Sequence, residues 1–184
     1  MFTKLIETIK KDKTNWEKFQ AMFTERVIPS KTILLHEGEI STHLYFIKKG
    51  CLRIWFNKDG KDITFQFFFE GQGVASIDSF LSNEPGLFTI ESIEPTVILI
   101  ITKVNFDHLN RCYPELKERF QEILFQRFRN YATLFLSRIK DTPQERYEDL
   151  MKNHPEIIQR VPQHYIASYL GITSISLSRI RNRR

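Results

Sequence analysis

Residues 165–180 read YIASYLGITSISLSRI, a pattern typical of two helices joined by a tight turn. Ala167 supplies the small residue that the first helix needs where the second helix crosses it, and Gly171 accepts the left-handed backbone of the turn. Thr173 can cap the second helix. The spacing therefore predicts a helix-turn-helix, although it also occurs in ordinary pairs of helices.

The outward face of the second helix helps to decide between these two interpretations. That face is small, polar and arginine-bearing, and residues 179–184 hold four Arg and no acid. A basic terminal run is most often a solvated tail, but guanidinium groups beside such a helix suit phosphates and guanine edges. We therefore expect nucleic-acid contacts from Ser174, Ile175, Ser176, Ser178, Arg179, Arg181, Asn182, Arg183 and Arg184.

A long helix is predicted over residues 114–139. Apolar residues recur there at steps of three and four, at Leu116, Phe120, Leu124, Phe128, Tyr131, Phe135 and Ile139. A second apolar line lies beside them, at Phe125, Ala132 and Leu136. One stripe packs on the helix's own domain and the second calls for another partner, most simply a second copy of the helix. A single wide buried stripe is the alternative.

A new helix is expected to begin after Lys140, because Thr142-Pro143-Gln144-Glu145 has the composition of a capping box with Pro at the first helical position. This boundary separates the preceding part of the chain from a last, all-helical unit.

Short apolar segments before residue 105 predict strands. They cover residues 33–35, 44–47, 52–56, 63–67, 88–91 and 97–101, with a helical turn at 77–81 and a helix over 2–23 ahead of Pro29. Asp59-Gly60 predicts a hairpin turn, because both residues tolerate positive φ. Strands at intervals of roughly ten residues favour a sandwich or a closed barrel over a parallel sheet.

Composition limits the class of protein. The 184 residues carry a net charge of +5, and the two cysteines, Cys51 and Cys112, lie far apart, which is typical of a reducing, cytoplasmic location. No stretch approaches the roughly 18 apolar residues of a membrane span, so no membrane partner is expected.

Signatures of an enzyme or a metal site are weak. The run His36-Glu37-Gly38-Glu39 lacks the second His of a zinc motif, and no Ser sits in a Gly-x-Ser-x-Gly elbow. We therefore expect neither a catalytic site nor a bound metal.

The whole order of segments resembles a known family. The glycine framework is similar to that of the cyclic-nucleotide-binding β-roll, and the quoted matches are Pro29-Ser30-Lys31, Gly38-Glu39, Leu44 to Gly50, Asp59-Gly60-Lys61 and Glu70-Gly71. Together with the long helix and the unit from Ile166 to Ile180, residues 20–184 resemble the CRP/FNR transcription regulators. The run from Tyr165 to Thr173 is similar to the Bacteroidetes-type branch.

This resemblance implies an α+β chain in three parts. Residues 1–108 are expected to form a β-roll (a double-stranded β-helix or jelly-roll) sensor, residues 109–140 a dimerisation helix, and residues 141–184 a helix-turn-helix domain without a C-terminal wing. The implied function is that of a transcription regulator that binds a two-fold site in double-stranded DNA as a homodimer. An unknown small effector and RNA polymerase are the further partners that it implies.

The carried-over base-reading positions are Ser174, Ile175 and Arg179. Relatives usually have an acid at the middle position, where it reads cytosine, and Ile175 departs from that pattern. A sensor or adaptor of the same fold without DNA binding is the alternative function, and the arginine-rich end speaks against it.

The sensor departs from the family pattern in its ligand chemistry. Binders of cyclic AMP use a Glu and an Arg whose places fall near Ser76 and at Gly86-Leu87, and no Arg or Lys occurs from Gly71 to Thr96. Cyclic AMP is therefore not an expected ligand, since a buried phosphate needs a countercharge, and Arg53 is the nearest substitute. The candidate effector-pocket residues are Arg53, Gly73, Val74, Ala75, Ser76, Gly86, Leu87, Phe88, Leu124 and Phe128. Two cysteines exclude the four-cysteine iron–sulfur cluster of the oxygen-sensing branch, so no cofactor is expected.

Overall fold

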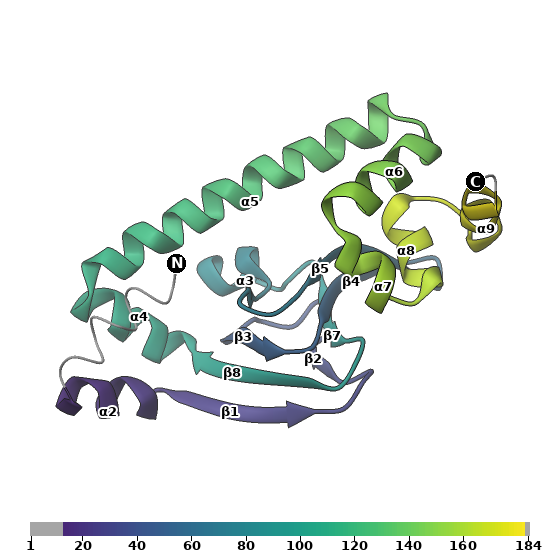
Figure 1. Cartoon of the computed structure of the whole chain (residues 1–184). Helices are drawn as coiled ribbons and strands as arrows, with labels where there is room; N and C mark the ends of the chain where they lie inside the picture. The colour runs from purple at the N-terminus through teal and green to yellow at the C-terminus, as the bar shows by residue number, and fades with distance from the viewer. Residues whose placement is uncertain (1–12, 183–184) are drawn as a thin grey trace.

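The computed structural model describes residues 13–182, which form a β-roll followed by six helices (Figure 1). No helix in this part of the chain combines the length and the apolar run that crossing a membrane demands. The roll is preceded by helix α2 (Lys13–Ala21) and contains the short helix α3 (Ile77–Ser82). Its strands are β1 (Phe23–Ile28), β2 (Ile33–Leu35), β3 (His43–Lys49), β4 (Leu52–Lys58), β5 (Lys61–Phe68), β6 (Gly73–Val74), β7 (Thr89–Ser92) and β8 (Thr96–Thr102).

Two four-stranded antiparallel sheets make up the roll, with strand orders β1-β8-β3-β6 and β2-β7-β4-β5. The predicted hairpin is confirmed: Asp59 and Gly60 have φ values of 53° and 77° and join β4 to β5. The expectation of one helix to Phe23 is wrong at its end, because α2 stops at Ala21 and Phe23–Ile28 pairs with β8. The start of that helix lies outside the described residues.

Helix α4 (Lys103–Cys112) follows the roll, and the long helix α5 (Pro114–Lys140) then runs over the roll from α4 to the C-terminal helices (Figure 1). The helical conformation is interrupted between the two at Tyr113, just ahead of Pro114. The expected domain boundaries after residues 108 and 140 stay predictions.

The last four helices gather at one end of the β-roll, above β4 and β5 (Figure 1). They are α6 (Pro143–Asn153), α7 (Pro155–Arg160), α8 (Gln163–Leu170) and α9 (Ser174–Asn182). The expected capping box opens α6: Thr142 Oγ1 accepts from Glu145 N at 3.3 Å, and Glu145 Oε2 accepts from Thr142 N at 2.7 Å.

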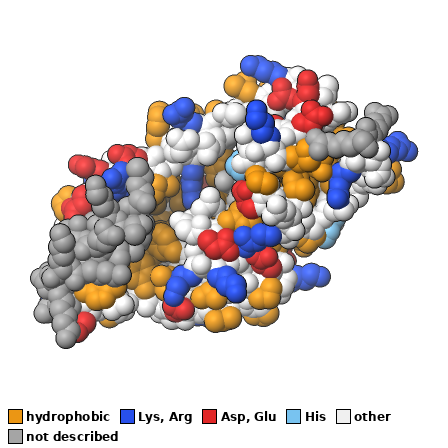
Figure 2. Space-filling model, in the orientation of Figure 1, with side chains coloured by type: hydrophobic (Ala, Val, Ile, Leu, Met, Phe, Trp, Pro, Cys, Tyr) orange, Lys and Arg blue, Asp and Glu red, His pale blue; other side chains and the backbone are white. Residues whose placement is uncertain are grey.

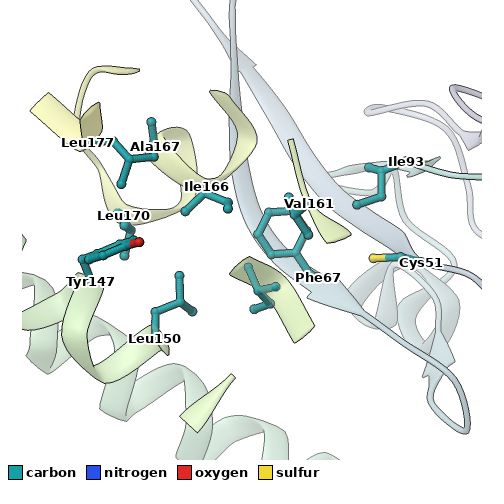
Figure 3. Close-up of a cluster of buried hydrophobic side chains, with 11 residues drawn as sticks. Cys51, Phe67, Ile93, Tyr147, Leu150, Val161, Ile166, Ala167, Leu170 and Leu177 are labelled. Atoms are coloured by element: carbon teal, nitrogen blue, oxygen red, sulfur yellow. The ribbon is translucent and has the colours of Figure 1, made fainter. Parts of the chain in front are cut away.

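One hydrophobic cluster joins these helices to the roll. Phe67, Cys51 and Ile93 come from the roll, and the side chains from the helices gather around them (Figure 3). The helical members are Tyr147, Leu150, Ile157, Val161, Ile166, Ala167, Leu170 and Leu177. Burial here raises the pKa of the Cys51 thiol to about 12. Because the cluster is continuous, the C-terminal helices are packed against the β-roll rather than tethered to it by a linker.

Replacing Leu177 with alanine is expected to lower the free energy of unfolding by about 2 to 5 kcal/mol, because the side chain is 1% exposed and its loss leaves a cavity. Ile175, on the same helix, is 67% exposed, and Ile175→Ala is the matched control, expected to change stability by about 0.5 kcal/mol or less. Urea unfolding measures both. Equal losses in the two variants would contradict the packing described for α9.

Candidate nucleic-acid interface and its contact with the β-roll

Helices α8 and α9 meet at the turn that the sequence predicts. Gly171 has φ 69° and its N–H donates to the Ser168 carbonyl at 3.0 Å, while Ile172 N donates to the Ala167 carbonyl at 3.0 Å. Ala167 is 1% exposed, as the helix crossing requires. Thr173 caps α9, because its Oγ1 accepts from Ser176 N at 3.1 Å. Each local expectation for this turn is confirmed.

The expected contact residues lie mainly on the outer side of α9. Ser174, Ile175, Ser178, Arg179, Arg181 and Asn182 are exposed, whereas Ser176 is half-buried with its hydroxyl 3.0 Å from that of Thr173. Arg183 and Arg184 lie outside the described residues. Residues 163–182 contain no Asp or Glu, so this surface carries positive charge without an acid of its own. Figure 2 shows Lys and Arg side chains at the end of the molecule where α9 lies.

A polar hollow of about 280 Å³ lies between α8 and α9. Its lining residues are Gln163, Ser178, Arg181 and Asn182, all of which carry hydrogen-bond donors. A hollow with a guanidinium and amide donors, and with no carboxylate in its lining, can accept the oxygens of an anionic backbone.

The opposite side of α8 contacts the roll through Arg53. This guanidinium is 1% exposed and its carbon lies 3.8 Å from the centre of the Tyr165 ring. Its Nη2 lies 2.6 Å from Glu91 Oε2 and 2.9 Å from Asp62 Oδ2. Two carboxylates therefore compensate the charge of Arg53, and the residue holds the contact between the roll and α8. Its assignment to an effector pocket stays a prediction.

Ser168 makes a second link between α8 and the roll. Its hydroxyl accepts from Thr64 N and donates to the Asp62 carbonyl, both at 2.9 Å. Thr64 and Asp62 belong to β5, so one side chain of α8 satisfies two backbone groups of that strand. This link fixes the register of α8 along β5.

An ion-pair cluster makes the third link, on α7. Arg160 donates to both oxygens of Glu70, at 2.8 and 2.9 Å, and also to Glu94. Gly50 N donates to Glu70 at 2.8 Å. The bond from Arg160 is the main reason that the pKa of Glu70 falls to about 2. The cluster lines a cleft of about 530 Å³ between the roll and α7, together with Lys49 and Pro95.

The candidate effector-pocket residues are brought together only in part. Ser76 and Gly86 adjoin each other, since a Cβ on Gly86 would lie 2.7 Å from Ser76 Oγ, and Phe88 stacks on Phe65 at 4.9 Å. Leu87 and Phe128 are exposed, at 63% and 67%. The others are buried or half-buried: Gly73, Val74, Ala75 and Leu124.

Arg127 is a residue that the sequence reasoning missed. It lies on the face of α5 that packs over the roll, donates from Nη2 to the Gly73 carbonyl and sits 5.1 Å from the centre of the Phe68 ring. Burial lowers its pKa below the ordinary value. Arg127 lies outside the stretch from Gly71 to Thr96 where the family pattern places the cation. Helical spacing from Phe120 and Tyr131 to this face was the signal that would have found Arg127.

Replacing Glu70 with glutamine is expected to lower the free energy of unfolding at pH 7 by about 1 kcal/mol or less, because the pair is partly exposed to solvent. The pKa of the carboxyl is depressed in the folded state, so the difference from wild type is full above about pH 4.5 and disappears as the pH falls towards 2. Unfolding measured across this range tests it. Glu84→Gln, at an exposed loop residue, is the control, and a gap that persists at pH 2 would refute the pairing.

Comparisons with known proteins agree with this architecture. A family model described as the cyclic nucleotide-binding domain matches residues 25–111. No curated protein matches the sequence.

Solved structures match over most of the chain. The c-di-GMP-responsive global regulator CLP of Xanthomonas campestris is 16% identical, with a TM-score of 0.75 over 94% of this chain and 91% of that one. FixK2 of Bradyrhizobium japonicum is 17% identical, with a TM-score of 0.74 over 88% and 83%. The catabolite activator protein of Thermus thermophilus is 18% identical, with a TM-score of 0.58 over 91% and 80%.

At these identities the likeness to solved structures concerns the fold. Residues 25–111 match the model of the cyclic nucleotide-binding domain family, and the chain as a whole shares the fold of these solved structures.

Proposed function

We propose that this chain is a transcription regulator, not an enzyme, that binds a two-fold DNA site as a homodimer and senses a small effector through its β-roll. The observation that carries the proposal is α9, which exposes Arg179 and Arg181 on a surface without acids. The shared fold with CRP/FNR-type regulators supports it. The run from Tyr165 to Thr173 favours the Bacteroidetes-type branch.

DNA contacts divide between bases and phosphates. Arg179 lies on the outer side of α9, where a guanidinium can form two hydrogen bonds to a guanine edge. Arg181 lines the polar hollow at the junction with α8, which suits a phosphate oxygen. Contacts of the first kind carry sequence preference, whereas contacts of the second kind set affinity and its dependence on salt.

Dimerisation is supported by the side of α5 that faces away from the roll. Leu116 is buried and Phe120, Leu124 and Tyr131 are half-buried on the inner side. Apolar residues remain exposed on the other side, at Phe125 65%, Phe128 67%, Phe135 65%, Leu136 47% and Ile139 67%. A continuous apolar stripe along a 27-residue helix fits a second copy of that helix. Two copies then present two α9 helices to a two-fold site.

Arg179→Ala is expected to cost about 1 to 3 kcal/mol of DNA binding and to relax the preference at one base position. Arg181→Ala is the matched variant, expected to weaken all sequences alike and to flatten the dependence on salt. Gel shifts with genomic fragments, at several salt concentrations, separate the two effects. Wild-type sequence preference in the Arg179 variant would refute its role, and a wild type that binds no fragment would favour the adaptor function.

Phe128→Lys is expected to shift the protein from dimer to monomer at micromolar concentration, because it puts a charge into an apolar seam. Its fold is expected to survive, since the side chain is 67% exposed. Gln126→Lys, at an exposed polar position of the same helix, is the control and stays dimeric. Light scattering measures the mass, and a monomeric wild type would contradict the dimer and the two-fold site with it.

A further inference from the structure

Three arginines are anchored on or against the β-roll, and their charges are compensated differently. Arg53 pairs with Glu91 and Asp62, and Arg160 pairs with Glu70 and Glu94. Among the described residues no ion pair joins Arg127 to an Asp or Glu, and the hydrogen-bond acceptor that it meets there is the carbonyl of Gly73. A partly buried guanidinium without a carboxylate is an electrostatic imbalance that an anion would correct.

A buried polar atom without a hydrogen-bond partner lies on β5, the strand whose Phe68 ring Arg127 contacts. Gln66 Oε1 is buried and accepts no hydrogen bond within the described part of the chain. Gln66 precedes Phe68 by two residues on β5, so both side chains leave the same face of the strand, and Arg127 stacks over Phe68. An amide at this place can present either its oxygen or its NH₂ group to a ligand.

Aromatic side chains adjoin this pair. Phe65 lies 5.1 Å from Tyr131 and 4.9 Å from Phe88, ring centre to ring centre, so β5, α5 and the start of β7 share one aromatic cluster. Tyr131 follows Arg127 by one helical turn on α5. A charged group at one end and flat apolar rings beside it match an organic anion with an aromatic or aliphatic body.

We propose that Arg127 and Gln66 form the anion-recognition site of the β-roll, for an organic anion whose apolar body packs against Phe65, Phe88 and Tyr131. The inference rests on the proposed effector-sensing function. Binding moves the guanidinium's hydrogen bond from the Gly73 carbonyl to the anion. Because Arg127 belongs to α5, the anion is then held between the roll and the helix that carries the dimer seam.

The test is titration calorimetry of the full chain, without DNA, using benzoate and its neutral counterpart benzamide as probes. Wild type is expected to bind benzoate at least about tenfold more tightly than benzamide, because only benzoate pairs with the guanidinium. Arg127→Gln is expected to lose that difference, and Arg129→Gln, at an exposed arginine half a turn away, is expected to keep it. Absence of benzoate binding to wild type, or an unchanged preference in Arg127→Gln, overturns the proposal.

Two further variants keep the test decisive if Arg127→Gln does not fold. Arg127→Lys retains the charge and is expected to retain the preference for benzoate, whereas Gln66→Leu is expected to weaken benzoate binding with the fold intact by circular dichroism. Equal benzoate affinity in Gln66→Leu and wild type overturns the assignment of Gln66.

Cyclic AMP is the third probe. We expect no binding below about 10 μM, roughly 7 kcal/mol, since the cassette stretch lacks its arginine. Tight binding that depends on Arg127 would support the anion site and overturn the exclusion of cyclic AMP. DNA binding is measured separately by gel shift, so failure of the anion site and failure of the regulator function are distinguished.

Discussion

The buried guanidinium of Arg53 is the interaction on which the arrangement of the two halves depends. A charge that is 1% exposed persists only with compensation, and Glu91 and Asp62 provide it from the strands on either side of β4. The flat face of the same group then stacks against Tyr165 on α8. One side chain of the β-roll is thereby neutralised by its own sheet and holds the first helix of the candidate DNA-binding unit.

This contact explains why α9 has a defined place on the molecule. Ser168 fixes α8 along β5, and the apolar cluster around Phe67 fills the space between the sheet and the four C-terminal helices. One side of α8 is held against the roll. The turn at Gly171 therefore places α9 on the opposite side of α8, where the polar side of α9 is exposed to solvent. The orientation of the candidate recognition helix is therefore set by the strands of the β-roll, not by a flexible linker.

Features that depend on a few neighbouring residues were predictable from the sequence. The Asp59-Gly60 hairpin, the Thr142 capping box and the Gly171 turn each follow from backbone preferences at one or two positions. Strand β1 was missed because the spacing of Phe19 and Phe23 is helical, and only its pairing with β8 makes it a strand. The role of Arg53 was missed for a related reason, since nothing near it in the sequence shows that α8 folds back onto β4 and β5.

Arg53, Arg160 and Arg127 show how the same side chain serves different purposes according to what surrounds it. Arg53 and Arg160 each pair with two carboxylates, which compensate their charges. Both lie where the roll meets the C-terminal helices, so these ion pairs help to hold the helices in place. Arg127 meets a carbonyl dipole and an aromatic ring, and no ion pair joins it to a carboxylate within residues 13–182. Of these three guanidinium groups, that of Arg127 is the least compensated, and it lies where α5 covers the roll. An anion that binds there would therefore change the electrostatic energy more than one that binds beside Arg53 or Arg160.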